Sequence, residues 1–489
     1  MLKPSVEIEG EAVAADAPLA PSVRWALVGL SLAVLMSSLN TSIANIALPT
    51  LAAAFDASFQ QVQWVVLTYL LAITTLIVSA GRLGDILGRR YLLLGGIFMF
   101  TGASVLCGVA PTLWWLIGAR FAQGLGAAVM MALTMAFVGD TAPKARTGSA
   151  MGLLGTMSAI GTALGPALGG LFIAGPGWRA IFLVNLPLGL LTLILAYRSL
   201  PADTQRSVVA RPRLDVAGTL VLALTLATYA LAMTIGRGSF GLLNLALLTA
   251  GIIGGGLFLR VEATASSPLI RLAMFRDATL STSLAMNLLV ATVMMATLVV
   301  GPFYLSRALE LDAAAVGLVM SAGPLVAALS GVPAGRLVDR FRPYRITTVG
   351  LIGMVVGLAA LAVAPTVFGA IGYVAAIIVV TANYALFQAA NNTAVMADVE
   401  PDQRGVISGT LNLSRNLGLI TGASAMGAVF AAASAATDVS TAPPEAVAAG
   451  MHTTFIFAAA LVVIALALAL RWQAAAPGPD QQCARQPSY

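Results

Sequence analysis

An arginine inside a long apolar run is the residue of this chain best suited to bind a solute. Arg120 lies about seven residues, or about 10 Å along a helix, from the nearer end of the run 113–138. A permanent cation at that depth needs water or polar partners, unless its side chain extends to the lipid headgroups. Gln123 follows Arg120 by one helical turn, and Asn40 and Asn45 lie in the first apolar run. These residue types favour a polar binding site within a membrane over covalent chemistry.

A second group of polar side chains lies in two apolar runs near the end of the chain. The group consists of Gln388, Asn391, Asn412 and Arg415. Polar groups within lipid must pair with one another or face water, so we expect both groups to line one substrate cavity. Two alternatives stay open. The amides could simply hold neighbouring helices together, and Arg415 could cap the carbonyl groups of a broken helix.

A short charged segment occurs twice, each time between two apolar runs, which is typical of a duplicated membrane bundle. The first copy contains Gly81, Asp85, Gly88, Arg89 and Arg90, and the second contains Gly335, Asp339 and Arg340. Glycines permit tight turns, carboxylates accept hydrogen bonds, and arginines remain among the headgroups. We therefore expect two loops that latch the cytoplasmic face and release it when helices move. For Arg89 and Arg90 alone, the alternative is that they only set the orientation of the chain.

The fifth apolar run contains closely spaced glycines and one proline. These residues are Gly161, Gly165, Pro166, Gly169 and Gly170. Glycines four residues apart form a groove for a neighbouring helix, and proline permits a kink. We expect this seam to pack against helices of the other half of the duplicated chain, where the two halves move against each other.

Fourteen apolar runs must position these residues. Hydrophobic residues make up 59% of the chain and charged residues only 9%, with a mean hydropathy of +0.93. Each run has about 20 residues or more, enough to cross about 30 Å of hydrocarbon as a helix. The runs are 25–48, 62–80, 91–110, 113–138, 149–174, 180–199, 214–236, 241–260, 279–305, 314–334, 346–365, 367–396, 405–433 and 451–472. They predict an all-α integral membrane protein with two six-helix bundles and two helices inserted between them.

The order of the runs divides the chain into five parts. These are an N-terminal tail (1–24), a six-helix bundle (25–200), a segment with two inserted helices and linker loops (201–278), a second six-helix bundle (279–472) and a C-terminal tail (473–489). Most of the 26 Lys and Arg residues fall on one side of the spans, as in cytoplasmic segments of membrane proteins. We therefore expect a multi-pass protein of the inner (plasma) membrane with both termini in the cytoplasm.

Composition also argues against several other classes of protein. The basic residues cluster at the ends of apolar runs rather than in patches with exposed aromatic residues, which argues against nucleic-acid binding. Two cysteines, Cys107 and Cys483, provide neither a disulfide framework nor a metal cluster, and no cofactor is expected. The sequence shows neither a nucleophile paired with a base nor a sizeable soluble domain, which argues against an enzyme or a sensor.

Several of these segments, in this order, resemble signatures of the major facilitator superfamily, and within it the fourteen-span drug:proton antiporters. The segments are Gln63–Tyr69, Gly81–Arg90, the surroundings of Arg120 and Gln123, Gly161–Gly170 and Trp178–Pro187. The resemblance covers nearly the whole of 25–472. It implies the major facilitator fold, with alternating access to a cavity between two six-helix bundles, and export of small amphipathic molecules. In that family the Gly165-Pro166 signature is associated with antiport.

One position departs from the family pattern. Asn40 stands where the first helix of the family typically carries an aspartate. No other carboxylate is expected in mid-membrane, because the remaining acids fall at helix ends, in loops or in the tails. Arg120 would then have only neutral partners. We expect a cavity of positive potential that prefers anionic, zwitterionic or neutral ligands to lipophilic cations.

The sequence thus predicts a secondary active transporter that exports small amphipathic compounds, as in multidrug efflux, and the resemblance implies proton-coupled antiport. The alternative is a dedicated exporter or uniporter of an anionic or neutral metabolite without proton coupling, which Asn40 beside Arg120 favours. The expected partners are the small-molecule substrate and membrane lipid. Coupling protons and an envelope-spanning efflux protein are further candidates.

Overall fold

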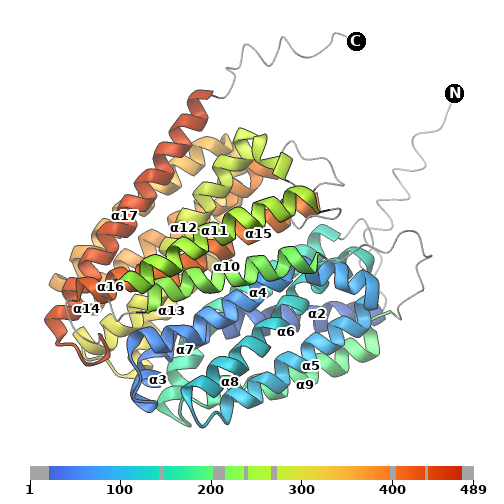
Figure 1. Cartoon of the computed structure of the whole chain (residues 1–489), viewed down its shortest axis with the longest axis horizontal. Helices are drawn as coiled ribbons and strands as arrows, with labels where there is room; N and C mark the ends of the chain where they lie inside the picture. Colours follow the sequence, from blue (N-terminus) through green and yellow to red (C-terminus); the bar gives the residue numbers. More distant parts are fainter. Residues whose placement is uncertain are drawn as a thin grey trace.

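The computed structural model describes residues 21–141, 147–201, 215–235, 241–265, 272–396, 404–434 and 439–475 of the 489-residue chain. Every regular element in this part of the chain is a helix, as the apolar runs predict (Figure 1). The predicted tails, 1–24 and 473–489, fall almost wholly outside the described residues.

The helices follow the predicted grouping. The first half contains α2 (Pro21–Ile46), α3 (Leu48–Ala54), α4 (Phe59–Leu87), α5 (Arg89–Gly108), α6 (Leu113–Thr141), α7 (Thr147–Ala174), α8 (Ala180–Leu183) and α9 (Asn185–Ser199). Two helices, α10 (Val216–Thr234) and α11 (Leu242–Thr264), and the 3-10 turn η2 (Leu272–Arg276) come next. The second half contains α12 (Ala278–Phe303), η3 (Tyr304–Ala308), α13 (Ala313–Arg340), α14 (Pro343–Met396), α15 (Arg404–Thr421), η4 (Gly422–Met426), α16 (Gly427–Ala433), η5 (Val439–Thr441) and α17 (Pro444–Ala475).

The described helices account for fourteen membrane spans. Thirteen helical segments are long and apolar enough to cross a bilayer, and one of them crosses it twice. One of these, α14, has 54 residues, or about 80 Å at the α-helical rise, which is more than twice the thickness of the hydrocarbon core. Its backbone leaves the helical region at Gly369, where φ is 56° and ψ is −137°, a conformation that glycine tolerates. We therefore count α14 as two spans joined at Gly369, close to the predicted boundary at residues 365–367.

Each half has its own packed centre. In the first half α2 packs against α7 and α9, and α6 packs against α4 and α5. In the second half α12 packs against α15 and α17, and α14 packs against α13 and α17. The two halves meet chiefly where α7 lies along α13.

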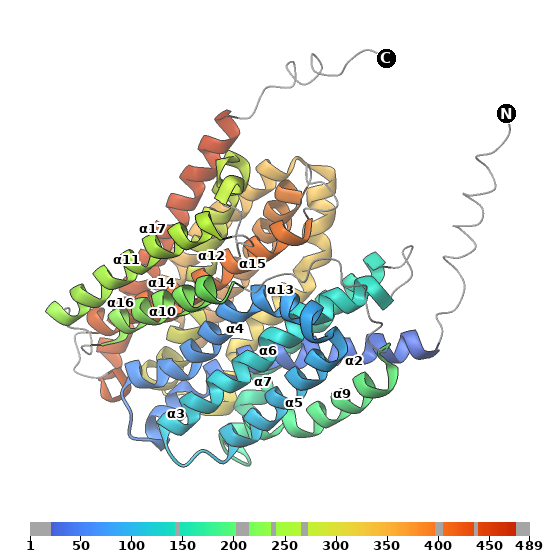
Figure 2. The same ribbon diagram turned by 45° about the vertical axis from the view of Figure 1, so that its right-hand side comes forward.

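The inserted helices lie on one side of the junction between the halves. Figures 1 and 2 show α10 and α11 side by side, with α10 next to α4. The α10 helix is held to α4 by a hydrogen bond from Trp64 Nε1 to Thr234 Oγ1 at 3.1 Å and by one between the hydroxyls of Ser79 and Thr219 at 2.8 Å. It also contacts η4 of the second half. Most of the large apolar side chains of α11 are exposed, as expected for a lipid-facing helix.

The ends of the spans form two faces of unequal charge. Because successive spans run in opposite directions, α2 begins and α17 ends at the same face, which we call the basic face; the other end is the opposite face. The described arginines at the basic face are Arg24, Arg82, Arg89, Arg90, Arg198, Arg260, Arg276, Arg336, Arg340, Arg342, Arg345, Arg404 and Arg471. Those at the opposite face are Arg179 and Arg307.

The two charged segments are mostly helical, so the expectation of two loops was wrong. The α4 helix continues through Gly81 and Asp85 to Leu87, and α13 continues through Gly335 and Asp339 to Arg340. Charge ends the apolar run but not the helix, because the helical backbone hydrogen bonds continue past the hydrocarbon core while the arginine side chains reach the headgroups. The first segment turns at Gly88, whose φ of 97° places it in the left-handed region that favours glycine, and the second turns at residues 341–342, between α13 and α14.

Candidate functional site

The guanidinium of Arg120 is buried among neutral groups of the first half. Only 1% of this side chain is exposed. Nε donates to the carbonyl oxygen of Val65 at 2.9 Å, and Nη1 donates to Oε1 of Gln123 at 2.7 Å. The guanidinium carbon lies 4.1 Å from the ring centroid of Tyr69 and 5.9 Å from that of Phe182. The cation is therefore stabilised by dipoles and aromatic rings, with no carboxylate among these contacts.

Gln123 connects Arg120 to three further helices. Its Nε2 donates to Oγ of Ser104 at 2.6 Å and to Oδ1 of Asn40 at 3.2 Å. The same Asn40 oxygen accepts a longer hydrogen bond, 3.5 Å, from Nδ2 of Asn185. We call these five residues the Arg120 network. The four amide and hydroxyl side chains are fully buried, and α2, α5, α6 and α9 each contribute at least one of them.

The network forms because α6 lies very close to α4. A Cβ atom at Gly124 would lie 2.7 Å from the carbonyl oxygen of Tyr69, so only glycine permits this approach. The close contact brings Arg120, one turn before Gly124, against the backbone of α4 at Val65. The position of Arg120 in its apolar run sets its depth, and Gly124 sets which helix, α4, its side chain contacts.

Three amide atoms, in Asn40, Asn45 and Asn185, are fully buried without a hydrogen-bond partner among the described residues. They are Nδ2 of Asn40, Oδ1 of Asn185 and Oδ1 of Asn45. The Nδ2 atom of Asn45 donates to the carbonyl oxygen of Thr41 within its own helix, so Asn45 lies outside the Arg120 network. In the described conformation this group does not face solvent. That Asn40, Asn45, Arg120 and Gln123 contact substrate stays a prediction.

The second predicted group divides into buried and exposed residues. Asn391 is fully buried and donates from Nδ2 to the carbonyl oxygen of Ser283 at 3.5 Å, while Gln388 is half-buried. Asn412 and Arg415 lie one turn apart on α15 and are both exposed. The side chains of Asn412 and Arg415 are therefore exposed in the described conformation, whereas those of the first group are buried.

Residues that join α12 to α15 were not among the predicted site residues. Asn287 Nδ2 donates to the carbonyl oxygen of Leu411 at 2.9 Å, and Ser414 Oγ donates to that of Leu284 at 2.6 Å. Asn185, Ser104 and Tyr69 were likewise missing from the predicted Arg120 site. Each of them is a polar side chain within an apolar run, which can be seen in the sequence. The sequence does not show which residue such a side chain bonds to.

The charged segment at residues 81–90 is attached to α9 of its own half. Arg90 donates to the carbonyl oxygen of Tyr197, and its guanidinium lies 5.4 Å from the centroid of that ring. The backbone of Asp85 lies in α4, and its side chain lies outside the described part of the structure. Asp339 and Arg340 are exposed at the end of α13. The latch that these segments were expected to form stays a prediction.

The glycine seam of α7 packs against two helices, not only against the other half. Cβ atoms at Gly161 and Gly165 would meet the backbone of α2 at 2.5 Å from Leu35 O and 3.0 Å from Ile43 N, and Gly169 also faces Ile43. These three glycines therefore pack within the first half, which corrects the expectation for them. Pro166 and Gly170 instead face Gly317 of α13 in the second half.

Further contacts between the halves lie near the opposite face. Nε2 of Gln63 donates to the carbonyl oxygen of Ala423 at 2.9 Å. The ring of Phe59 packs edge-on against those of Phe303 and Phe430, with centroids 4.8 and 5.4 Å apart. Ala423 lies in η4, a π-helical segment of a kind found often at functional sites. Together with Gly170 and Gly317, these side chains close the junction between the halves at this face.

One acid in the inserted segment lies within a helix rather than in a loop. Glu262 belongs to α11, which extends to Thr264, and is only 3% exposed. A Cβ atom at Gly218 would lie 2.7 Å from Glu262 Oε1 and would also touch Oδ2 of Asp215. Two carboxylates thus flank Gly218 near the basic face, and both lie at helix ends, Asp215 before the first turn of α10 and Glu262 in the last turn of α11, as expected for acids outside mid-membrane.

Comparison with known proteins gives consistent matches. A family model described as Major Facilitator Superfamily matches residues 30–423. The riboflavin transporter RibZ of Clostridioides difficile (strain 630) is 31% identical over 413 residues, covering 83% of this chain and 88% of that protein. The drug efflux pump JefA of Mycobacterium tuberculosis (strain ATCC 25618 / H37Rv) is 31% identical over 447 residues, covering 85% and 82%.

A solved structure shares the fold. A bacterial homolog of the human lysosomal transporter Spinster, in an inward-facing and unoccupied conformation, matches with a TM-score of 0.69. The match covers 93% of this chain and 97% of that one, at 17% sequence identity.

Proposed function

The chain belongs to the major facilitator superfamily, and from this premise we propose that it exports small amphipathic compounds across the plasma membrane by alternating access. The family and the fold are those of transporters rather than enzymes. Drug efflux pump and riboflavin transporter are the names of two similar proteins, and both names denote carriers of small molecules. Efflux of amphipathic compounds is the function consistent with the largely apolar interior.

The observation that carries the proposal is the contrast between the two faces. At the opposite face, Gln63 bonds to Ala423 and Gly170 approaches Gly317 closely. Near the basic face, the same two helices have glycines that meet nothing. Cβ atoms at Gly155 of α7 and Gly335 of α13 would have no atom within 4 Å. This contrast supports a conformation that admits substrate from the basic face. The excess of arginine at that face supports a cytoplasmic location, which suits the first step of export.

The Arg120 network supports a preference of the transporter for substrates without a net positive charge. The described contacts of Arg120 are neutral, so the first half keeps an uncompensated positive charge in its interior. A buried charge acts over a longer distance than a hydrated one, because the low dielectric screens it weakly. Anionic, zwitterionic and neutral amphipaths are the preferred substrates, and lipophilic cations are transported less well.

A second candidate function follows from Asn40. An amide at this position cannot exchange a proton at physiological pH, so the network lacks the acid that would couple transport to protons. The alternative is therefore a carrier of an anionic or neutral metabolite that moves down its gradient without proton coupling.

Both candidates are tested in everted membrane vesicles from cells without their major efflux pumps. Respiration energises the vesicles, and uptake of matched anionic, neutral and cationic amphipaths is followed with and without a protonophore. Uptake that the protonophore abolishes supports proton-coupled antiport, and uptake that survives it supports the alternative. Uptake of none of the three classes, with the protein present in the membrane, contradicts both.

A further inference from the structure

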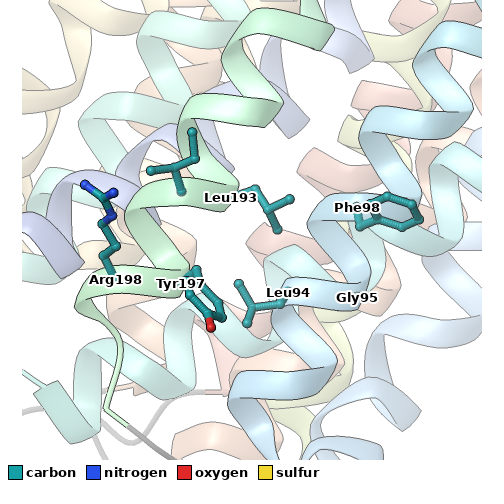
Figure 3. A pocket seen from close by; sticks show the side chains of 7 residues that line it. Leu94, Gly95, Phe98, Leu193, Tyr197 and Arg198 are labelled. Carbon is teal, nitrogen blue, oxygen red and sulfur yellow. The ribbon is translucent and has the colours of Figure 1, made fainter.

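A groove lies on the outer surface of the first half, between α5 and α9. Its volume is about 620 Å³, within the range of small-ligand sites. Figure 3 shows Leu94 and Tyr197 between the two helices, Phe98 on α5, and Arg198 at the end of α9 with its guanidinium on the side of α9 away from α5. The groove is distinct from the Arg120 network, whose residues are buried inside the same half.

The groove faces the acyl chains of the leaflet at the basic face. Phe98 is 70% exposed and Tyr197 is 65% exposed, although both side chains are large and apolar over most of their surface. Leu94 and Phe98 lie about 8 and 14 Å from the start of α5 at the basic face, which is within one half of a 30 Å hydrocarbon core. An exposed apolar groove at this depth contacts lipid, not water.

The two helices touch at both ends of the groove. At the deeper end, Gly189 of α9 packs against the side chain of Thr101 of α5. At the basic face, Arg90 of α5 donates to the carbonyl oxygen of Tyr197. Between these contacts, a Cβ atom at Gly95 would meet nothing within 4 Å. The groove is therefore open at Gly95, between the two contacts.

Positive charge gathers at only one end of this space. Arg198 lines the groove and is exposed, and the guanidinium of Arg90 lies over the ring of Tyr197. Arginine binds phosphate through several N–H donors, and basic pockets at the cytoplasmic ends of helices recognise anionic lipid headgroups. The remainder of the lining is apolar.

We propose that this groove binds one anionic phospholipid, with its phosphate at Arg198 and Arg90 and an acyl chain along Leu94, Gly95 and Phe98. The occupant is a lipid rather than a free phosphate, because an anion alone would leave the apolar length of the groove unfilled. The bound lipid fills the space between α5 and α9 without taking part in transport of the substrate.

The first test fills the groove. Purified protein is titrated with phosphatidylglycerol or phosphatidylcholine, and lipid retention is measured by native mass spectrometry. We expect preferential retention of one phosphatidylglycerol, and its loss in Gly95→Leu. The matched control is Gly102→Leu, two turns further along the same helix, where a Cβ atom also meets nothing within 4 Å. Equal retention by the two variants would overturn the proposal, as would equal retention of the two lipids by the unmodified protein.

The second test removes charge without changing the shape of the groove. Arg198→Gln should weaken phosphatidylglycerol binding about fivefold and leave phosphatidylcholine binding unchanged, because one basic residue near an anionic surface contributes about that factor. Arg198→Lys should restore most of the preference. Arg260→Gln is the control, since Arg260 is an exposed arginine at the same face on α11. An equal effect of Arg198→Gln and Arg260→Gln would indicate a general surface charge effect and contradict a specific site.

Discussion

Nε2 of Gln63 in α4 donates a hydrogen bond of 2.9 Å to the carbonyl oxygen of Ala423, 360 positions later in the chain. This bond joins a side chain of the first half to the backbone of the second, and both groups are buried. The π-helical segment η4 presents the carbonyl, and its neighbour Gly427 leaves room for the amide. This amide is thus one of the links between the two halves at the face where they are closed.

We expect Gln63→Leu to shift the protein away from the conformation closed at the opposite face. The substitution keeps an apolar side chain in the contact but leaves the Ala423 carbonyl buried without this donor. Such a loss costs about 1–3 kcal/mol, which corresponds to a change of about 5- to 150-fold in the ratio of the two conformations.

The shift is measured as a distance between spin labels on Ala54→Cys in α3 and Ala314→Cys in α13, both exposed near the opposite face. Longer distances should be more populated in Gln63→Leu. Thr68→Val serves as control, because it also removes a side-chain hydrogen bond of α4, but one that stays within the helix at Trp64. Identical distance distributions in Gln63→Leu and Thr68→Val would show that the Gln63 bond does not control closure.

A methyl group at Gly317 should slow transport. Its Cβ atom would lie 2.5 Å from the carbonyl oxygen of Pro166 and 2.8 Å from the Cα atom of Gly170, and backbone atoms cannot rotate away. Overpacking of this kind costs about 1–3 kcal/mol, so uptake by vesicles should fall about tenfold for Gly317→Ala. Gly331→Ala on the same helix meets no atom within 4 Å and should transport normally. Equal uptake by the two variants, at equal expression, would argue against a tight α7–α13 contact in the cycle.

Gly218→Ala should lower the thermal stability of the purified protein. The added Cβ atom would lie 2.7 Å from Oε1 of Glu262 and would also press on Oδ2 of Asp215, so one buried carboxylate must move. We expect a loss of about 1–3 kcal/mol. Gly255→Ala on α11 meets nothing within 4 Å, so its melting temperature should be unchanged or slightly higher. A melting temperature of Gly218→Ala equal to that of Gly255→Ala would show that α10 and α11 adjust freely here.

Hydrophobic run length predicts the spans well because lipid imposes it directly. A helix must be apolar over about 20 residues to cross the hydrocarbon core, so the fourteen runs correspond to the described spans. Helix ends are less well predicted, since charge stops the apolar run at Gly81 but does not stop the helix before Leu87. The same limit ended the eighth apolar run at residue 260, although α11 continues through Glu262 to Thr264.

The partners of polar residues are harder to predict than the residues themselves. Depth in the membrane identifies Arg120 as a residue that needs polar partners. Depth does not show which neighbouring helix provides them, because every side of a helix has neighbours at the same depth. The partner helix depends on where glycines permit close approach, as at Gly124 against Tyr69. For the same reason Gly161 and Gly165 were expected to face the second half but pack against α2. Periodicity shows a face, and only the packed structure shows what covers it.

Asn40 is the position where one substitution best distinguishes the two proposed functions. Its Oδ1 atom is joined to Arg120 through Gln123, over hydrogen bonds of 3.2 and 2.7 Å. A carboxylate here would lie on the order of 7 Å from the guanidinium, which gives an attraction of about 2 kcal/mol at an effective dielectric constant of 20. Removal of the carboxylate from water costs several kcal/mol, so the charged and protonated forms would compete.

We therefore expect Asn40→Asp to make transport depend on pH and to improve the uptake of cationic amphipaths relative to anionic ones. When the acid is ionised it neutralises the field of Arg120, and when it is protonated that field returns. Uptake of matched anionic, neutral and cationic amphipaths is measured in vesicles at several pH values. Asn40→Ala is the control, because it removes the same hydrogen bonds without adding a charge. If Asn40→Asp and Asn40→Ala show the same substrate ranking at every pH, the charge of the Arg120 network does not select the substrate.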